Sequence, residues 1–535
     1  MNPRVLVVPG VCLGMALLVL GPLLGRGFVL TYDMVFTPRQ FLLADAFGLG
    51  SALPRSVPAD AVMAAVTSLV PGDLVQQVLL FGALFAGPLG AARLVPSEAI
   101  GVRVVAAVSY GWTAYLAERL VMGHWPYLLA YAALPWVVTA SRSGTARLVL
   151  ACVPGILTPT GGILVAGAAI VGGGTRRLRV TVPVALVLNA PWLVAALSHT
   201  ANSLSTEDGV AAFAARGETW GGPVLSVLGL GGIWNAEVVP GSRGNPVLPV
   251  VTVLTVAVAL LGLREIRERW ARRITLLGAF GVLLAALPTV PGGGELLGWT
   301  VANVPGGGLL RDSQKWVAWW ALPAALGVAM AVGRLNRKAV LAAAVAVPVL
   351  LLPDFAFGAW GRLHPVEYPA DWAAVRDILA RDDRVGDVVT MPFGAFRQFG
   401  WNADRTQLDP APRFLPRSTV VDDTLYVNGR ALAGEDPRAA AVRRGEPLGR
   451  LGIGWVLVER GTPSHVDTAG LEPVYRGRWL DLYRVGGPVG DPPDGPPVAP
   501  VLVAFVAAGS LILFSLLWLA LPTGRLTALH RRGQE

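Results

Sequence analysis

Long apolar runs recur along this chain, and they constrain its fold more than any other feature. A helix that crosses the hydrocarbon core of a bilayer needs about 20 apolar residues, and several of the runs approach this length. The pattern predicts a polytopic α-helical membrane protein with about 11–12 transmembrane helices. The apolar runs lie at 4–25, 74–95, 100–118, 126–141, 146–158, 160–173, 179–198, 247–264, 274–290, 314–333, 338–353 and 498–521.

The composition excludes other classes of protein. Hydrophobic residues make up 53% of the chain and charged residues only 15%, which excludes a disordered chain. The formal net charge of +9 would suit nucleic acid, but the excess arginines flank the apolar runs, where they set topology. We therefore expect no nucleic-acid partner. Cys12 and Cys152 both sit in apolar runs and support neither a disulfide framework nor a zinc site.

Arginine placement predicts the orientation in the plasma membrane. If the N-terminus is cytoplasmic and the runs alternate, the arginine-rich loops fall in the cytoplasm, and both termini are cytoplasmic. This assignment treats 146–158 and 160–173 as two short or broken helices that meet at a Pro/Gly turn over Leu157–Gly162. Merging them into one span would place the arginine cluster at 264–273 outside, against the positive-inside rule.

The same reasoning divides the chain into three parts. Residues 1–353 form a multi-span domain with two long extracytoplasmic loops, 26–73 and 198–246. Residues 354–497 are polar and predict a small extracytoplasmic α/β domain. Residues 498–535 give a final transmembrane helix and a basic cytoplasmic tail.

Within the polar domain, several stretches have clear periodicity. Residues 371–379 have helical spacing, 388–391 and 454–458 resemble buried strands, and 474–483 resembles a hairpin.

Carboxylates gather on the predicted extracytoplasmic side, and Asp33 is the most informative of them. It follows the first apolar run by about eight residues, in a mainly apolar stretch. A carboxylate held there can have a raised pKa and act as a general base. The alternative interpretation is a helix cap or a partner for Arg26 or Arg39.

A second candidate cluster lies in the predicted outward turn 117–127. Glu118 and His124 are candidates for contacting substrate or a divalent ion, and Arg119 for holding a phosphate. A lone histidine in an interfacial Trp/Tyr belt is more often structural.

A third cluster follows the glycine run that begins at Gly306. Arg311 and Lys315 are four residues apart, which predicts one helical face near a helix N-terminus and hence a phosphate clamp. The alternative is a helix start closed by an Asp312–Lys315 pair. In the second long loop, Trp220 and Trp234 are candidates for sugar stacking or for interfacial anchoring.

Together these features resemble the GT-C superfamily of membrane glycosyltransferases, in particular the actinobacterial arabinofuranosyl- and mannosyltransferases of cell-envelope assembly. Asp33 matches the position of their catalytic acid in the first loop. The Gly123-His124-Trp125 turn and the segment from Arg311 to Lys315 also look like those relatives. The chain departs from the paired acidic motif of many members, and Asp45, Asp60 or Glu118 would have to substitute for the missing acid.

The resemblance implies a polyprenyl-phosphate sugar donor and an envelope glycan or glycolipid acceptor. Asp33 would be the general base, and Arg311, Lys315 and Arg119 would stabilise the departing lipid phosphate. A divalent cation, Mg or Mn, is the implied cofactor, with Glu118, His124, Asp312 and Asp45 as the candidate ligands.

Two other functions remain open from the sequence. One is a transporter or flippase for a lipid-linked saccharide, favoured by the break at Leu157–Gly162. The other is a non-catalytic envelope-assembly scaffold, in which 354–497 binds a protein partner.

Overall fold

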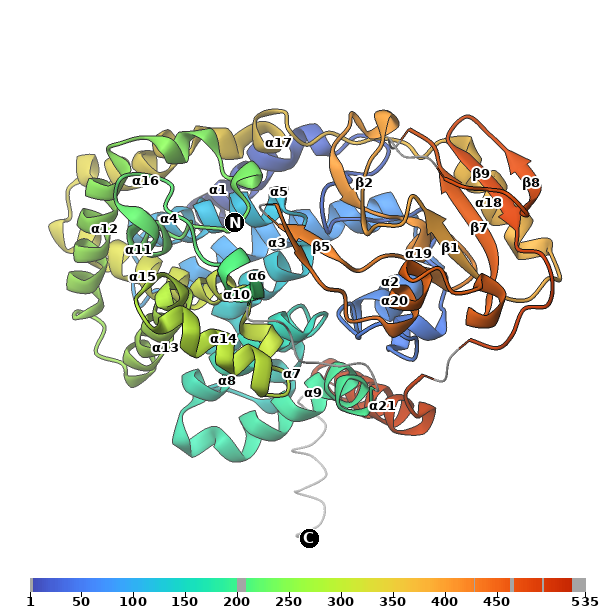
Figure 1. Cartoon of the computed structure of the whole chain (residues 1–535). Coiled ribbons are helices and arrows are strands. Elements are labelled where there is room, and N and C mark those ends of the chain that lie inside the picture. The colour runs from blue at the N-terminus through green and yellow to red at the C-terminus, as the bar shows by residue number, and fades with distance from the viewer. Residues whose placement is uncertain (1–2, 200–207, 428, 462–465, 493–494, 522–535) are drawn as a thin grey trace, which may run out of the picture.

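The chain folds into a bundle of apolar helices with a sheet domain at one side (Figure 1). The computed structural model describes residues 3–199, 208–427, 429–461, 466–492 and 495–521. Within these residues, seven helices are long and apolar enough to cross a membrane, or eight if the bent pair Lys338–Leu351 and Pro353–Trp360 forms one span. The helices of the seven spans, some of which continue into an adjoining 3₁₀ turn, are α1 (Pro3–Leu20), α3 (Gly72–Leu94), α4 with α5 (Ile100–Gly111 and Ala114–Val121), α9 (Leu178–Ser198), α13 (Arg269–Ala286), α15 (Ala318–Leu335) and α21 (Val498–Ala520).

This count is smaller than the predicted 11–12 because several apolar helices are shorter than 18 residues. Proline and glycine begin or end some of them; α8, for example, starts at Pro159, and Thr158 caps it by accepting from the Gly161 amide. The shorter helices are α6 (Trp125–Ala140), α7 (Thr145–Cys152), α8 (Pro159–Gly173), α12 (Leu248–Leu263) and α16 (Lys338–Leu351).

The region 146–173 forms two helices, as the Pro/Gly turn predicted. Residues 153–158 form the turn between α7 and α8. The Leu157 carbonyl in this turn accepts a hydrogen bond from the Ala59 amide at 3.1 Å. The turn is therefore covered by the first long loop, as non-helical backbone near a bilayer requires.

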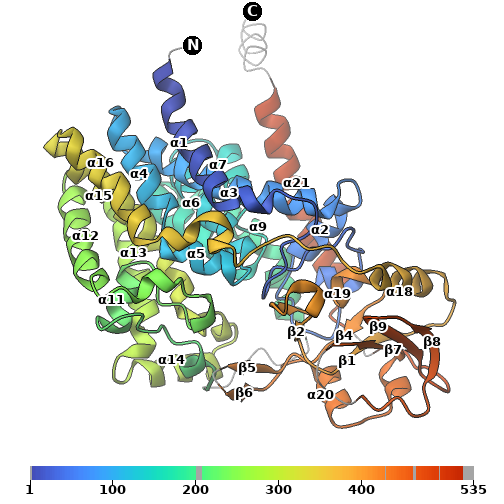
Figure 2. The same cartoon turned by 90° about the horizontal axis from the view of Figure 1, so that it is seen from above.

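The loops between the long helices form short helices that gather at one end of the bundle. Figure 2 shows α11 and α14 at the end that carries the sheet domain, whereas α1 begins and α21 ends at the opposite end. The loop helices at this end are α2 (Ala59–Thr67), α10 (Asp208–Ala212), α11 (Gly222–Leu228), α14 (Gly293–Asn303), α17 (Ala356–Trp360) and the 3₁₀ turns η1 (Gly21–Leu23), η2 (Ala44–Phe47), η4 (Ala236–Val238), η5 (Gly241–Gly244), η6 (Leu287–Thr289), η7 (Gly307–Leu310), η8 (Ser313–Val317) and η9 (Pro353–Phe355). A further 3₁₀ turn, η3 (Thr175–Arg177), joins α8 to α9.

The polar region before α21 contains a five-stranded mixed sheet with the order β4-β1-β7-β9-β8. β1 is parallel to β4 and β7, and β9 is antiparallel to β7 and β8. The predicted helix, the two predicted strands and the predicted hairpin are all present, as α18, β1, β7 and β8–β9. The elements are α18 (Ala370–Arg381), β1 (Asp387–Met391), β2 (Phe396–Gln398), η10 (Gly400–Asn402), β3 (Thr406–Leu408), α19 (Ala411–Phe414), β4 (Thr419–Val420), β5 (Leu425–Val427), β6 (Arg430–Leu432), α20 (Pro437–Arg443), η11 (Leu448–Leu451), β7 (Ile453–Glu459), β8 (Glu472–Arg476) and β9 (Leu480–Arg484).

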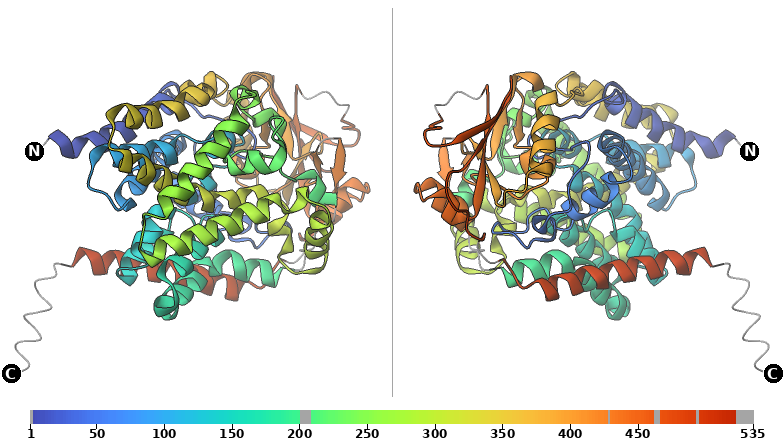
Figure 3. Two further views of the ribbon diagram at one scale, coloured as in Figure 1. Left: turned by 90° about the vertical axis from the view of Figure 1, so that its left-hand side faces the viewer. Right: turned by 90° about the vertical axis from the view of Figure 1, so that its right-hand side faces the viewer.

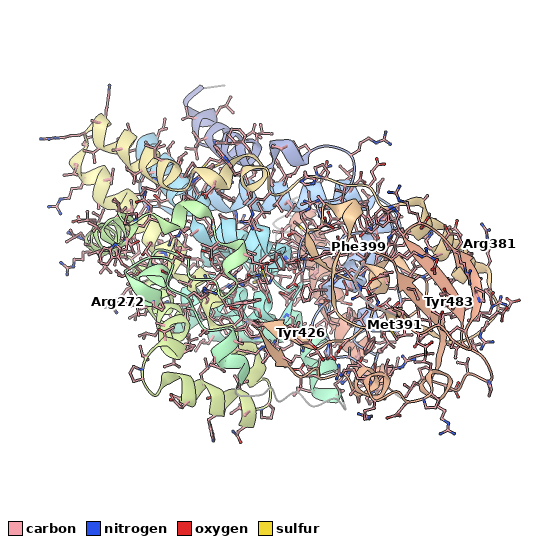
Figure 4. The ribbon with its side chains drawn as sticks, turned by 45° about the horizontal axis from the view of Figure 1, so that its top comes forward. Arg272, Arg381, Met391, Phe399, Tyr426 and Tyr483 are labelled. Carbon is pink, nitrogen blue, oxygen red and sulfur yellow. The ribbon has the colours of Figure 1, made fainter. Side chains whose placement is uncertain are left out.

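Two hairpins connect this sheet domain to the helix bundle. The β2–β3 hairpin pairs with the first long loop, because Tyr32 donates its amide to Thr406 O at 2.6 Å and accepts from the Leu408 amide at 2.8 Å. The β5–β6 hairpin packs Val427 and Leu432 against α10 in the second long loop. In Figure 4 its residue Tyr426 lies between Met391 of the sheet and the helices.

We expect the sheet domain to be extracytoplasmic, which cysteine labelling can check. The two native cysteines are buried. A side chain at Gly434 would collide with Asp423, whereas the neighbouring Ala433 is exposed. An Ala433→Cys variant should react with a membrane-impermeant maleimide in intact cells.

The matched control is Ala339→Cys, which is exposed at the start of α16. It should react only after the cells are permeabilised. Reaction of Ala339→Cys in intact cells would contradict the predicted orientation. The predicted basic tail at 522–535 lies outside the described residues.

Candidate functional site

Asp33 lies in a tight turn that contacts the connection between α5 and α6. The Met34 amide donates to Thr31 O at 2.8 Å, and the Thr31 hydroxyl donates to Val121 O at 2.9 Å. The Asp33 amide donates to Met122 O at 3.3 Å. Tyr32 has a φ of 39°, an uncommon conformation for a residue other than glycine, and β3 holds it on both sides through the backbone. The first loop, the helix bundle and the sheet domain thus all fix Asp33.

The Asp33 carboxylate forms a hydrogen bond with His124. The Nε2 atom of His124 lies 3.0 Å from Oδ2 of Asp33, and its Nδ1 atom lies 2.9 Å from Nη1 of Arg119. A guanidinium only donates, so Nδ1 must accept, and the neutral ring carries its proton on Nε2. His124 therefore donates to Asp33 and orients it. The Asp33 side chain remains 40% exposed, so it is accessible to a substrate.

Arg119, a predicted phosphate ligand, is enclosed by protein groups. Its side chain is fully buried, and its guanidinium also pairs with Asp312 at 3.0 Å and with Gln314. Burial opposes ionisation of Asp312, but the charges of Arg119 and Lys315 hold its pKa below the ordinary value. The predicted turn at 117–127 is also shorter than expected, because α5 continues to Val121 and encloses Arg119.

Arg311 and Lys315 do not share one helical face, contrary to the sequence prediction. η7 ends before Arg311, Asp312 is non-helical, and Lys315 belongs to η8, so the chain changes direction between the two cations. The Arg311 guanidinium lies 4.6 Å from the ring centroid of Phe213, the residue directly after α10. Burial lowers the pKa of Arg311, and the charge of Arg55 lowers it further. Lys315 is buried beside Trp316.

Two further arginines approach Asp33 from parts of the chain that sequence reasoning did not connect to it. Arg55 pairs with Glu435 at 2.5 Å, and Arg413 pairs with Asp60 at 3.0 Å. Burial lowers the pKa of each arginine, but the neighbouring carboxylates, Asp33 among them, hold it above the ordinary value. No local sequence signal marks these arginines, because they meet Asp33 only through the packing of the sheet domain.

The other candidate acids lie apart from Asp33. Glu118 is fully buried and accepts from the Ile233 amide at 3.3 Å, next to Glu218, which pairs with Arg243 at 2.6 Å. It therefore holds the second long loop in place. Asp45 lies at the sheet-domain interface, where burial raises its pKa and a hydrogen bond from Ser418 partly offsets this effect.

The two tryptophans have different surroundings. Trp234 is partly buried and packs edge-on against Phe213, with 4.7 Å between ring centroids. Trp220 is 69% exposed and donates from its indole to Pro246 O at 2.8 Å. Only Trp220 therefore presents an open ring face.

The described residues contain no group of three or more His, Cys, Asp or Glu side chains arranged to hold a metal ion. The histidine beside Asp33 already uses both ring nitrogens for hydrogen bonds. The arrangement therefore does not fit the divalent cation that the family resemblance implies.

An apolar cavity of about 380 Å³ lies between α4, α12, α15 and α16. Trp112, Thr113 and Ala114 line it where α5 begins, and Arg243 is its charged residue. The helix that carries Arg119 thus borders this cavity at one end and reaches the Asp33 site at the other.

The fold and the site define a polytopic membrane protein in which loops and a sheet domain surround the accessible carboxylate of Asp33. No protein-family model matches the chain, and no curated protein matches it. Among solved structures the chain is similar to the cryo-EM structure of arabinofuranosyltransferase AftD from mycobacteria, with a TM-score of 0.55 and 18% identity. The match covers 92% of this chain but 40% of that one. This likeness supports the GT-C-like fold expected from the sequence.

The contact between Gly123 and the Asp33 turn leads to a stability prediction. A methyl group at Gly123 would lie 2.3 Å from both Met34 N and Thr31 O, and Gly123 has a φ of +75°. Gly123→Ala should lower the free energy of unfolding by about 1–3 kcal/mol. Thermal unfolding of the detergent-solubilised protein measures this loss.

Gly509→Ala is the matched control, because nothing lies within 4 Å of the added methyl group in α21. It should leave the unfolding temperature unchanged or raise it slightly. Equal unfolding temperatures for Gly123→Ala and the parent protein would show that the turn does not need glycine.

Proposed function

We propose that this protein is an integral-membrane glycosyltransferase. It moves a sugar from a polyprenyl-phosphate donor to a hydroxyl group of an envelope glycan or glycolipid on the extracytoplasmic face. The observation that carries the proposal is the pairing of the accessible Asp33 carboxylate with His124, beside Arg55 and Arg413, with Arg311 next to Arg55. The structural likeness to a membrane arabinofuranosyltransferase supports the class of reaction.

Asp33 is the general base in this proposal. His124 donates to Oδ2 of Asp33, so the other carboxylate oxygen takes the proton from the acceptor hydroxyl. The acceptor oxygen then forms a bond to the anomeric carbon of the donor sugar. The bond from that carbon to the phosphate oxygen breaks, its electron pair leaves with the lipid phosphate, and the configuration inverts.

The cations near Asp33 stabilise the departing phosphate. Arg311 is held by stacking on Phe213, and no described residue accepts a hydrogen bond from its guanidinium, which can therefore donate to phosphate oxygens in this proposal. Lys315 adds a buried positive charge, and Arg119 acts through His124 rather than on the donor. Charges that are fixed before reaction stabilise the developing phosphate charge without a reorganisation cost.

The apolar cavity supports a lipid-borne donor. Its walls are mainly aliphatic side chains from helices of the bundle, so it suits a hydrocarbon chain better than a free sugar. A donor held by its lipid needs no nucleotide-binding loop, and the sequence contains no Walker motif.

Replacing the proposed base tests the function directly. Asp33→Asn keeps the shape of the side chain but removes the proton acceptor, so transfer should fall by about 10²–10⁴-fold. The assay follows radiolabelled sugar from decaprenyl-phosphate arabinose and, separately, from decaprenyl-phosphate mannose.

Asp73→Asn is the control, because Asp73 is another first-loop acid and stands at the start of α3. It should keep full activity. Undiminished transfer by Asp33→Asn would refute the base, and absence of transfer by the parent protein with either donor would favour the scaffold alternative.

The donor contact gives a second prediction. Arg311→Gln should weaken donor binding by about 10- to 100-fold, because a hydrogen bond to a charged group is worth about 1.5–3 kcal/mol. Binding is measured in detergent micelles by titrating the polyprenyl-phosphate sugar. The control is Arg216→Gln, because Arg216 is an exposed arginine of the second long loop, and this variant should bind the donor like the parent protein. If Arg311→Gln also binds the donor with the affinity of the parent protein, Arg311 contributes to packing alone.

A further inference from the structure

Three arginines from different elements converge at the end of the bundle remote from Asp33. Arg142 follows α6, Arg177 ends η3 between α8 and α9, and Arg273 lies in the first turns of α13. We call these residues the arginine corner. His124 precedes α6 and Arg142 follows it, and a helix of 16 residues is about 24 Å long. The corner is therefore one bundle length away from the proposed reaction site.

Close backbone contacts bring these arginines together. The guanidinium of Arg273 occupies the space over Gly174, where a methyl group would lie 1.7 Å from Nη1. A methyl group added at the neighbouring Gly173 would lie 3.1 Å from Arg177 Cβ and 3.2 Å from the carbonyl oxygen of Ser141, one residue before Arg142. The Arg142 guanidinium lies 4.5 Å from the ring centroid of Trp270 in α13.

The charge of the corner is poorly compensated within the protein. The Nε and Nη2 atoms of Arg177 are buried and have no hydrogen-bond partner among the described residues. Among the described residues, Glu268, which precedes α13, is the carboxylate whose charge acts on Arg142. Buried N–H groups of a guanidinium are costly to leave unpaired, so the corner favours an anion with several acceptor oxygens.

The surroundings indicate where that anion comes from. Exposed apolar side chains lie on the two helices that pack against α8 on this side, Leu178 and Leu186 on α9 and Leu276, Phe280 and Leu283 on α13. In Figure 3 the sheet domain lies at the other side of the molecule from the ends of α1 and α21. Figure 4 likewise places Arg272, a neighbour of Arg273, far from the sheet-domain residues Arg381 and Tyr483.

We propose that the arginine corner binds the phosphate headgroup of an anionic membrane phospholipid in the leaflet remote from the sheet domain. The phosphate oxygens accept from Arg142, Arg177 and Arg273, and the acyl chains lie along the exposed apolar faces of α9 and α13. This site is separate from the proposed donor site and does not depend on the proposed reaction. Binding at this site depends on the three arginines at these positions, whereas binding to a diffuse basic surface would depend only on the total charge.

The test is lipid binding by the purified full chain in nanodiscs. Native mass spectrometry compares retained phosphatidylglycerol with retained phosphatidylcholine. The parent protein should retain phosphatidylglycerol preferentially. In the variant R142Q/R177Q/R273Q, the ratio of retained phosphatidylglycerol to retained phosphatidylcholine should fall by at least about tenfold.

The control variant R264Q/R337Q/K338Q removes the same charge from the same end of the bundle and should keep the preference. The variant R142K/R177K/R273K preserves the charge and should keep part of the preference for phosphatidylglycerol. Its unfolding temperature shows whether the arginine corner still folds. Equal losses in the corner and control variants would overturn the proposal in favour of diffuse surface charge. The unfolding temperature in lipid-free micelles is also measured with inorganic phosphate and with phosphatidylglycerol. If inorganic phosphate raises it as much as phosphatidylglycerol does, the assignment to a lipid is overturned.

Discussion

A continuous line of hydrogen bonds from Asp33 through His124 and Arg119 to Asp312 is the interaction on which the site depends. It joins the first long loop, the α5–α6 connection and the segment before α15. Because Arg119 donates to His124 Nδ1, the histidine must donate to Asp33, so a fully buried charge sets the tautomer at the accessible end. Removing any member would leave a buried polar group unpaired, which couples the stability of this region to its chemistry.

The sheet domain belongs to the site rather than standing apart as a binding module. Its β2–β3 hairpin fixes Tyr32 next to Asp33, Arg413 contributes a cation, and Glu435 holds Arg55. The β5–β6 hairpin packs on α10, where Phe213 supports Arg311. A buried group of Arg397, Asp409 and Glu459 lies beneath the first hairpin. The domain thereby holds both the proposed base and the proposed phosphate ligand in place.

Patterns that repeat along the chain made much of the fold predictable. Apolar runs located the helices, the Pro/Gly turn separated α7 from α8, and alternation located β1, β7 and the β8–β9 hairpin. Asp33, His124 and Arg311 were identified as separate candidates from local residue types. Their partners were not, because the contact of Asp33 with His124 and the approach of Arg55 and Arg413 depend on distant packing. The single helix expected over Arg311 and Lys315 was wrong, since the backbone at Asp312 breaks it.

The sheet domain is attached to the bundle at both of its ends. The preceding helix, α16, packs against α4, while the following helix, α21, packs against α7 and α9. These anchors sit on separate sides of the bundle, so the domain cannot swing outward about a single hinge as a lid does. In the proposed reaction, the lipid-borne donor would therefore approach Asp33 from the bilayer, and the acceptor would approach it from the side of the β2–β3 and β5–β6 hairpins. A sheet domain tied to the bundle at both ends would then limit the size of the acceptor that reaches Asp33, and its attachment would contribute to acceptor selectivity.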